Sequence, residues 1–325
     1  IVRLSGKMDT QGSLTWEVPQ GRWTILRFGH TSTGKTSHPV NAVTGGGLEI
    51  DKLSAKAMDD FWRDGIQPIL DHLGPLAGTV LNNLLIDSYE TGSANWTEHF
   101  DQQFQARLGY DCFSYYPAMA GYCVESGGQS ERFLWDIRKV CSDLMAENYY
   151  DHFRDLCHQR GILFSTEPYT GPFNGLRVGE PSDIVMGEFW MGDTGMSTSS
   201  KLAASIAHIC GRTLVGAEAF TANERDARWN RTHADMKTLG DRYWCEGINR
   251  YIFHTYVHQP TDAAPGYTLG QFGSHFNRLN TVWPQHHYYM DYVNRSQYLL
   301  QQGHFVGDVL VFTGEATPNN GTFCR

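Results

Sequence analysis

The chain has 325 residues, of which 41% are hydrophobic and 19% charged, a composition typical of a globular protein with a full core. Its formal net charge of -9, with no basic block, argues against nucleic acid as a partner. No apolar run reaches the length of about 18 residues that a membrane-spanning helix needs, so no membrane span is predicted.

Apolar runs along the chain predict seven strands, at 23–28, 81–86, 162–166, 184–187, 213–217, 250–256 and 306–312. Helical spacing of apolar residues between them predicts helices over 53–70, 96–108, 131–158, 199–209, 233–247 and 285–302. Residues 1–22 are expected to be lead-in strands from a preceding β domain. Residues 23–325 are expected to form one (β/α) domain that is truncated, the domain that carries the candidate site residues described below.

The predicted strands are continuous apolar runs rather than alternating ones, as in a parallel sheet covered on both faces. The fold class is therefore α/β, either a (β/α)8 TIM-type barrel or a doubly wound sheet. No GxGxxG or Walker-type loop follows a predicted strand, which weakens the doubly wound, nucleotide-binding alternative. We favour the barrel and expect it to be incomplete at the C-terminus, because no eighth strand is visible.

Four glutamates follow apolar runs at the point where each run ends: Glu90, Glu167, Glu188 and Glu218. Each has an aromatic residue one or two positions away, and Asp87 shares the strand end of Glu90. A barrel gathers the carboxyl ends of its strands around one mouth, so these side chains are expected to converge. Crowded carboxylates serve as an acid/base pair or hold a cation. The alternative is four unrelated, solvated loop residues.

Paired carboxylates suit glycoside hydrolysis, in which one protonates the leaving oxygen while the other attacks the sugar or activates water. Asp87 and Glu167 are expected to bind substrate or to support the acid through hydrogen bonds. Trp96 and Trp190 are candidate platforms for the apolar face of a sugar. Ordinary core packing is the alternative for each tryptophan.

His254 and His258 form a second group of candidates. Residues four apart on an extended strand point the same way, so both imidazoles are expected to face the barrel mouth. Hydrogen bonding to substrate hydroxyls is the favoured role, with packed core histidines as the alternative. The chain has no HExxH motif, which argues against a zinc site of that kind.

Several blocks of the sequence, in order, resemble the glycoside hydrolase family 106 α-L-rhamnosidases. They include 22–30 (RWTILRFGH), 86–90 (IDSYE), 130–136 (SERFLWD), 186–190 (MGEFW), 217–221 (AEAFT) and 254–260 (HTYVHQP). The resemblance extends from about residue 14 to residue 315. The segment 278–284 departs from it, because the double tryptophan expected after Thr281 is absent.

The resemblance implies hydrolysis of terminal α-linked L-rhamnose from plant polysaccharides and glycosides, with inversion at the anomeric carbon. It also implies a barrel as the catalytic domain and a calcium ion in its active site. The family's essential glutamates match Glu90, Glu188 and Glu218 by motif. Glu90 would be the general acid, and either Glu188 or Glu218 the base, with the other helping to hold calcium. The substrate class implies a carbohydrate partner and a periplasmic or extracellular location.

Two other functions remain open from the residues alone. One is a different glycosidase on the same barrel, retaining and independent of metal. The other is a non-catalytic carbohydrate-binding barrel, which fits less well because every candidate acidic residue is present.

Overall fold

The structure is a computed structural model that describes residues 1–36, 46–195, 197–227 and 229–319. Its centre is one parallel sheet of five strands: β1 (Asn83–Ile86), β2 (Leu163–Thr166), β3 (Ile184–Trp190), β4 (Val215–Thr221) and β5 (Arg250–Phe253). The strands lie side by side in chain order, whereas a doubly wound sheet reverses its order at a switch point. The fold is therefore α/β with a five-strand parallel half-barrel, consistent with part of a TIM-like barrel.

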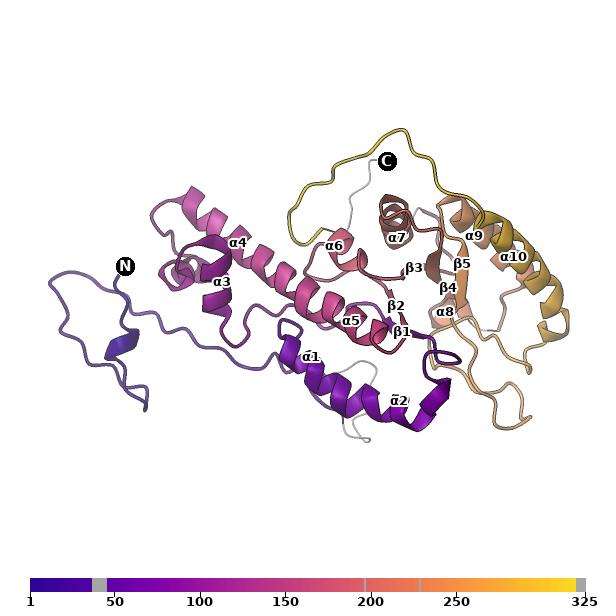
Figure 1. Cartoon of the computed structure of the whole chain (residues 1–325), viewed down its shortest axis with the longest axis horizontal. Coiled ribbons are helices and arrows are strands. Elements are labelled where there is room, and N and C mark those ends of the chain that lie inside the picture. Colours follow the sequence, from indigo (N-terminus) through magenta and orange to yellow (C-terminus); the bar gives the residue numbers. More distant parts are fainter. Residues whose placement is uncertain (37–45, 196, 228, 320–325) are drawn as a thin grey trace.

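Helices connect and cover the strands (Figure 1). They are α1 (Ala55–Phe61), α2 (Gln67–Leu73), α3 (Phe100–Leu108), α4 (Gly127–Met145), α5 (His152–His158), α6 (Gly175–Gly179), α7 (Thr198–Ile209), α8 (Glu224–Ala227), α9 (His233–Cys245) and α10 (His286–Leu300). Short π-helical turns, Trp62–Ile66 and Ala146–Asp151, join α1 to α2 and α4 to α5. The predicted helices over 53–70 and 131–158 are thus confirmed as nearly continuous helical segments. Short 3₁₀ turns span Ser5–Lys7, Gly74–Leu76, Cys112–Ala120 and Trp283–Gln285.

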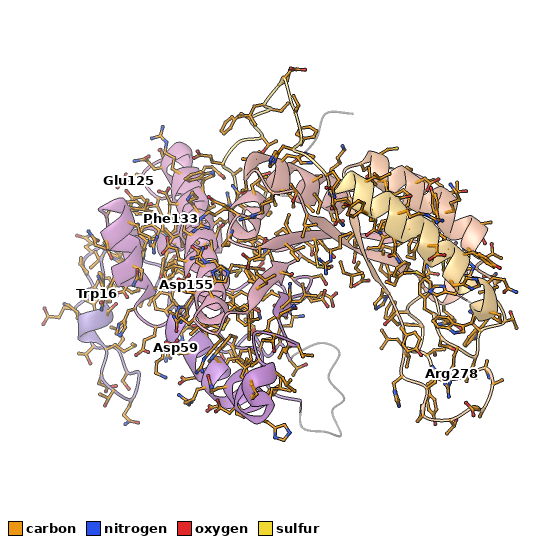
Figure 2. The ribbon with its side chains drawn as sticks, turned by 45° about the vertical axis from the view of Figure 1, so that its right-hand side comes forward. Trp16, Asp59, Glu125, Phe133, Asp155 and Arg278 are labelled. Carbon is orange, nitrogen blue, oxygen red and sulfur yellow. The ribbon has the colours of Figure 1, made fainter. Side chains whose placement is uncertain are left out.

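Apolar side chains form two buried clusters. One lies among the helices before and after β1 and includes Phe104, Phe133 and Tyr150; Figure 2 labels Phe133 on α4. The other packs α7 and α9 against β3 and β4 and includes Phe189 and Phe220. Because most residues of β3 and β4 are buried, these two strands form a rigid support for whatever their carboxyl ends carry.

The predicted strands at 23–28 and 306–312 are wrong: no strand lies in either range. Side chains of both segments are largely exposed, among them those of Ile25, Val306 and Phe312. An apolar run forms a strand only when a neighbouring strand takes up its backbone hydrogen bonds, and neither segment has one in the structure. Within residues 1–22 the structure has the first 3₁₀ turn and an isolated bridge between Met8 and Leu14. Among the described residues, every helix is too short or too polar to cross a membrane.

Candidate active site

Strand pairing places the carboxylates in two adjacent sets. Ile86 at the end of β1 pairs with Thr166 at the end of β2, so Asp87 and Glu167 leave the sheet side by side. Glu188 on β3 pairs directly with Glu218 on β4. Paired residues of neighbouring strands point to the same face of a sheet. The register therefore brings both sets to the carboxyl-terminal end of the sheet.

Asp87, Glu167 and Glu218 form the tightest group, because each offers a carboxylate oxygen within 4.8 Å of the others. Glu167 is only 1% exposed. The Tyr169 hydroxyl donates a 2.6 Å hydrogen bond to Oε2 of Glu167, while Oε1 of Glu167 has no hydrogen-bond partner. A buried carboxylate oxygen without a donor is costly, so this arrangement calls for a proton or a cation.

Crowding changes the proton affinity of this group. Burial, and then the charges of Glu188 and Asp87, raise the pKa of Glu218 to about 7. Burial, followed by the charge of Asp87, raises the pKa of Glu167 well above its ordinary value. Both shifts have the same cause, since negative charges that lose water and approach one another favour the protonated form. A divalent cation bound among these oxygens would instead lower the pKa values of both glutamates, because it favours the ionised form.

The three carboxylates fit a hard cation such as calcium by their chemistry. Calcium takes six to eight oxygen ligands, many of them carboxylates. The site offers carboxylate oxygens from three strand ends, and Oε1 of the buried Glu167 has no hydrogen-bond partner. Glu218 belongs to this group, whereas Glu188, the other residue expected to bind metal, does not.

His254 lies against Glu218 on the β5 side. Its Nδ1 is 2.8 Å from the Thr221 hydroxyl and 3.4 Å from Oε1 of Glu218. Burial lowers the pKa of His254, so the ring is neutral at pH 7 and the contact with Glu218 is a polar contact rather than an ion pair.

A cavity of about 340 Å³ adjoins the carboxylates. Its lining is polar and aromatic, with no lysine or arginine among the described residues: Tyr169, Thr170, Glu188, Trp190, Asp193, Gly195, Ser197, Thr198 and Ser199. Tyr169 contacts Glu167 and also lines the cavity, so it joins the two parts of the site. The cavity is large enough for a sugar ring next to Glu188.

The structure brings most of the candidate residues together, but not all of them. Glu90 is exposed, accepts a 2.8 Å hydrogen bond from the Ser88 hydroxyl, and contributes to the raised pKa of Glu218. Trp190 lines the cavity. Trp96 instead packs among aromatic rings of the helical region, against His30 and Phe100.

The prediction that His254 and His258 face the same way on one strand is wrong. β5 ends at Phe253, and a turn begins at His254, so the alternation of an extended strand does not continue to His258. His258 is exposed, whereas His254 turns toward Glu218. The run 250–256 was predicted as one strand because aromatic residues continue to Tyr256, but the pairing of β5 with β4 ends at Phe253.

Several residues of the site were not predicted from sequence. Tyr169, Asp193 and Ser197 come from the loops that follow β2 and β3, and Ser199 comes from the first turn of α7. Loops after the strands of a barrel build its active sites, so their position was the available signal. Their residue types alone carry none, because tyrosine and serine are common in any loop.

Comparison with known proteins identifies the family of the chain. The family model for α-L-rhamnosidases of glycoside hydrolase family 106 matches residues 1–323. A protein of Formosa agariphila provisionally named a beta-glucuronidase is 56% identical over 320 residues, which are 98% of this chain and 27% of that protein. The solved structure of a rhamnosidase from Novosphingobium sp. PP1Y matches with a TM-score of 0.84 and 32% identity, over 97% of this chain and 31% of that one. This chain therefore belongs to glycoside hydrolase family 106, the α-L-rhamnosidase family.

Proposed function

We propose that the protein removes terminal α-linked L-rhamnose from plant polysaccharides or glycosides, with inversion at the anomeric carbon. The observation that carries the proposal is the pairing of Glu188 with Glu218 at the ends of β3 and β4, next to the carboxylates from β1 and β2. Family membership supplies the reaction class, and this arrangement gathers at one end of the sheet the carboxylates that acid/base chemistry and a bound cation would use.

Glu90 is the proposed general acid and Glu188 the proposed base. Glu90 stands at the exposed edge of the site, where a leaving group departs into solvent. Glu188 lines the cavity and is not one of the three carboxylates, Asp87, Glu167 and Glu218, that could hold a metal ion. Its carboxylate can therefore take a proton from water. His254 is proposed to hold sugar hydroxyls.

Asp87, Glu167 and Glu218 are the residues proposed to hold calcium. When bound, the ion neutralises their charge and offers coordination positions to sugar hydroxyls. Tyr169 fixes the orientation of Glu167 through its hydrogen bond to Oε2. The other oxygen of Glu167 is thereby left for the ion.

A neutral sugar suits this site better than a uronic acid does. The described lining of the cavity includes Glu188 and Asp193 and has no lysine or arginine to pair with a sugar carboxylate. A glucuronide would bring a further negative charge into a crowded anionic site, which is unfavourable at low dielectric. L-Rhamnose, a 6-deoxy sugar, brings none.

The test is release of nitrophenol from nitrophenyl α-L-rhamnoside, measured beside nitrophenyl β-glucuronide, with and without a calcium chelator. Release from the rhamnoside that the chelator abolishes and added calcium restores is the expected result. Release from the glucuronide alone would overturn the choice of sugar. Release that the chelator leaves unchanged would favour a metal-independent glycosidase.

The stereochemical part has its own measurement. Proton NMR of the first product formed should show β-L-rhamnose before mutarotation sets in, as inversion requires. First formation of the α-anomer would indicate a retaining enzyme instead. Because plant polysaccharides are too large to enter a cell intact, we also propose that the protein acts in the periplasm or outside the cell.

A further inference from the structure

Serine hydroxyls from the beginning of α7 converge on the backbone of Glu188. The Ser199 hydroxyl accepts a 3.1 Å hydrogen bond from the Glu188 N–H. The same hydroxyl donates a 3.0 Å hydrogen bond to the Glu188 carbonyl oxygen. The Ser197 hydroxyl donates to the same carbonyl at 3.0 Å, and that of Ser200 lies at 3.3 Å. A carbonyl oxygen has two lone pairs, so the two shorter contacts, from Ser197 and Ser199, account for it.

The backbone of Glu188 needs these partners because the sheet does not hold it regularly. Pairing of β3 with β2 ends at Val185, three residues earlier. Pairing with β4 shifts register between Glu188 and Trp190, which marks a bulge. Bulges re-aim side chains next to active sites, and the unpaired backbone groups must find other partners.

Close contact between α7 and β3 lets the hydroxyls reach the strand (Figure 1). A Cβ atom added at Gly187 would lie 2.7 Å from backbone atoms of Ser199 and Ser200, so only glycine permits this approach. Ser197 also caps α7, since its hydroxyl accepts from the Ser200 N–H.

Further hydrogen bonds hold the loop that carries Ser197. The Ser197 N–H donates to the carboxylate of Glu246, the residue that follows α9, at 3.3 Å. Asp193 accepts from the Trp190 N–H and from the Tyr243 hydroxyl, each at 2.9 Å. The loop between β3 and α7 is therefore anchored to α9 as well as to the strand it follows.

We propose that Ser199, with Ser197, is a positioning residue for Glu188, and that the two hydroxyls set where the Glu188 carboxylate stands relative to Glu218 and the cavity. The inference rests on the proposed role of Glu188 as the base. A base displaced by about 1 Å can lose on the order of a hundredfold in rate while substrate binding is retained. The hydroxyls would then affect turnover more than binding.

The experiment compares Ser199→Ala, Ser199→Thr and Ser182→Ala with the wild type on nitrophenyl α-L-rhamnoside. Ser182 is the matched control: it is fully buried, its hydroxyl donates to the Gly179 carbonyl at 2.7 Å, and it lies outside the site. We expect Ser199→Ala to lower kcat by about tenfold or more with KM nearly unchanged. Ser199→Thr should restore most of kcat, and Ser182→Ala should lower Tm without changing kcat.

A crystal structure of Ser199→Ala provides a readout that does not depend on activity. We expect the Glu188 carboxylate to move by more than about 0.5 Å, or to occupy two positions, while Glu218 stays in place. If Ser199→Ala fails to fold, Ser197→Ala removes the other hydroxyl. An unmoved Glu188 and an unchanged kcat would overturn the inference.

Glu188→Gln separates the inference from the function on which it rests. If Glu188→Gln is inactive while Ser199→Ala keeps full kcat, only the positioning role fails. If Glu188→Gln keeps full activity, the proposed role of Glu188 fails, and the crystal structure alone decides whether Ser199 holds it in place.

Discussion

Carboxyl groups of one chemical type acquire different properties in this site because their surroundings differ. Glu167 is buried with one oxygen unbonded, Glu218 is half-buried against two other carboxylates, and Glu90 stands in solvent. Burial and crowding favour the protonated form of a carboxyl group, or a bound cation. An exposed carboxyl group can instead transfer its proton to a leaving group and regain it from water. The proposed division of roles between the glutamates rests on these environments.

Substrates with different leaving groups should distinguish the acid from the base. Glu90→Gln should lose about 10²–10⁴-fold in kcat on an alkyl rhamnoside, whose leaving group needs a proton, and much less on nitrophenyl rhamnoside. Glu188→Gln should lose a similar factor on both substrates, because activation of water is needed in either case. Glu224→Gln, an exposed glutamate on α8, should match the wild type. Equal losses for Glu90→Gln on both substrates would contradict its role as acid.

The strand-end glutamates could be predicted from sequence because an apolar run followed directly by a carboxylate is visible in one dimension. The contacts of Tyr169 and Ser199 could not, since each depends on strand register and on a helix approaching within van der Waals distance. The same limit explains Trp96, whose aromatic neighbours lie on other segments of the helical region.

Elements differ in how well their sequence determines them. The runs that became β1 to β5 all have parallel neighbours, and helices cover them. The runs at 23–28 and 306–312 are also apolar, but no strand pairs with them in the structure. Strand propensity without a pairing partner did not make them strands. The long helix over 131–158 was predicted well because its spacing is local information.

Gly187 provides a test of the contact between α7 and β3. A side chain there would overlap the backbone of α7, which cannot move as a flexible side chain would. Gly187→Ala should lower the free energy of unfolding by about 1–3 kcal/mol or more, as overpacking does. Gly127→Ala, at the beginning of α4 with open space around it, is the matched control and should be neutral or slightly stabilising. Urea unfolding measures both, and equal stability of the two variants would contradict the tight contact.

The contact between α9 and α10 should make stability depend on pH. His233 and His286 lie 3.1 Å apart, and burial, followed by the nearby His233, lowers the pKa of His286 to about 4. The unfolded chain takes up this proton near pH 6.5 and the folded one only near pH 4, so stability is lost as pH falls between them.

For His286 this loss amounts to about 2 kcal/mol between pH 7 and pH 5. Urea unfolding at both pH values should show that His286→Asn loses less stability than the wild type by about that amount. An identical loss in the two proteins would show that His286 is not the group responsible.

At the scale of the whole molecule, the arrangement of strands turns separate sequence features into one site. Strands in chain order place the carboxyl ends of β1 to β4 along one edge, so residues as distant as Asp87 and Glu218 approach within 4.8 Å. The barrel-type order could be anticipated from alternating strands and helices. The grouping of Asp87, Glu167 and Glu218 could not be anticipated, because it depends on which strand ends come closest.

Cation binding should therefore couple this site to the stability of the whole fold. Calcium that binds the folded state at a hundred times its Kd would add about 2.7 kcal/mol to the free energy of unfolding, seen as a rise in Tm. Glu167→Gln and Glu218→Gln should lose this rise, since each removes a carboxylate of the group. Glu188→Gln should keep it while losing activity, which separates binding of the ion from turnover.

Magnesium is the control ion, and it should raise Tm less, because it demands a tighter octahedral geometry than three strand-end carboxylates offer. Differential scanning calorimetry with a chelator, calcium and magnesium compares these cases directly. If calcium leaves the Tm of the wild type unchanged at millimolar concentration, the carboxylates hold protons rather than a metal. The raised pKa of Glu218, about 7, would then describe the working state of the site.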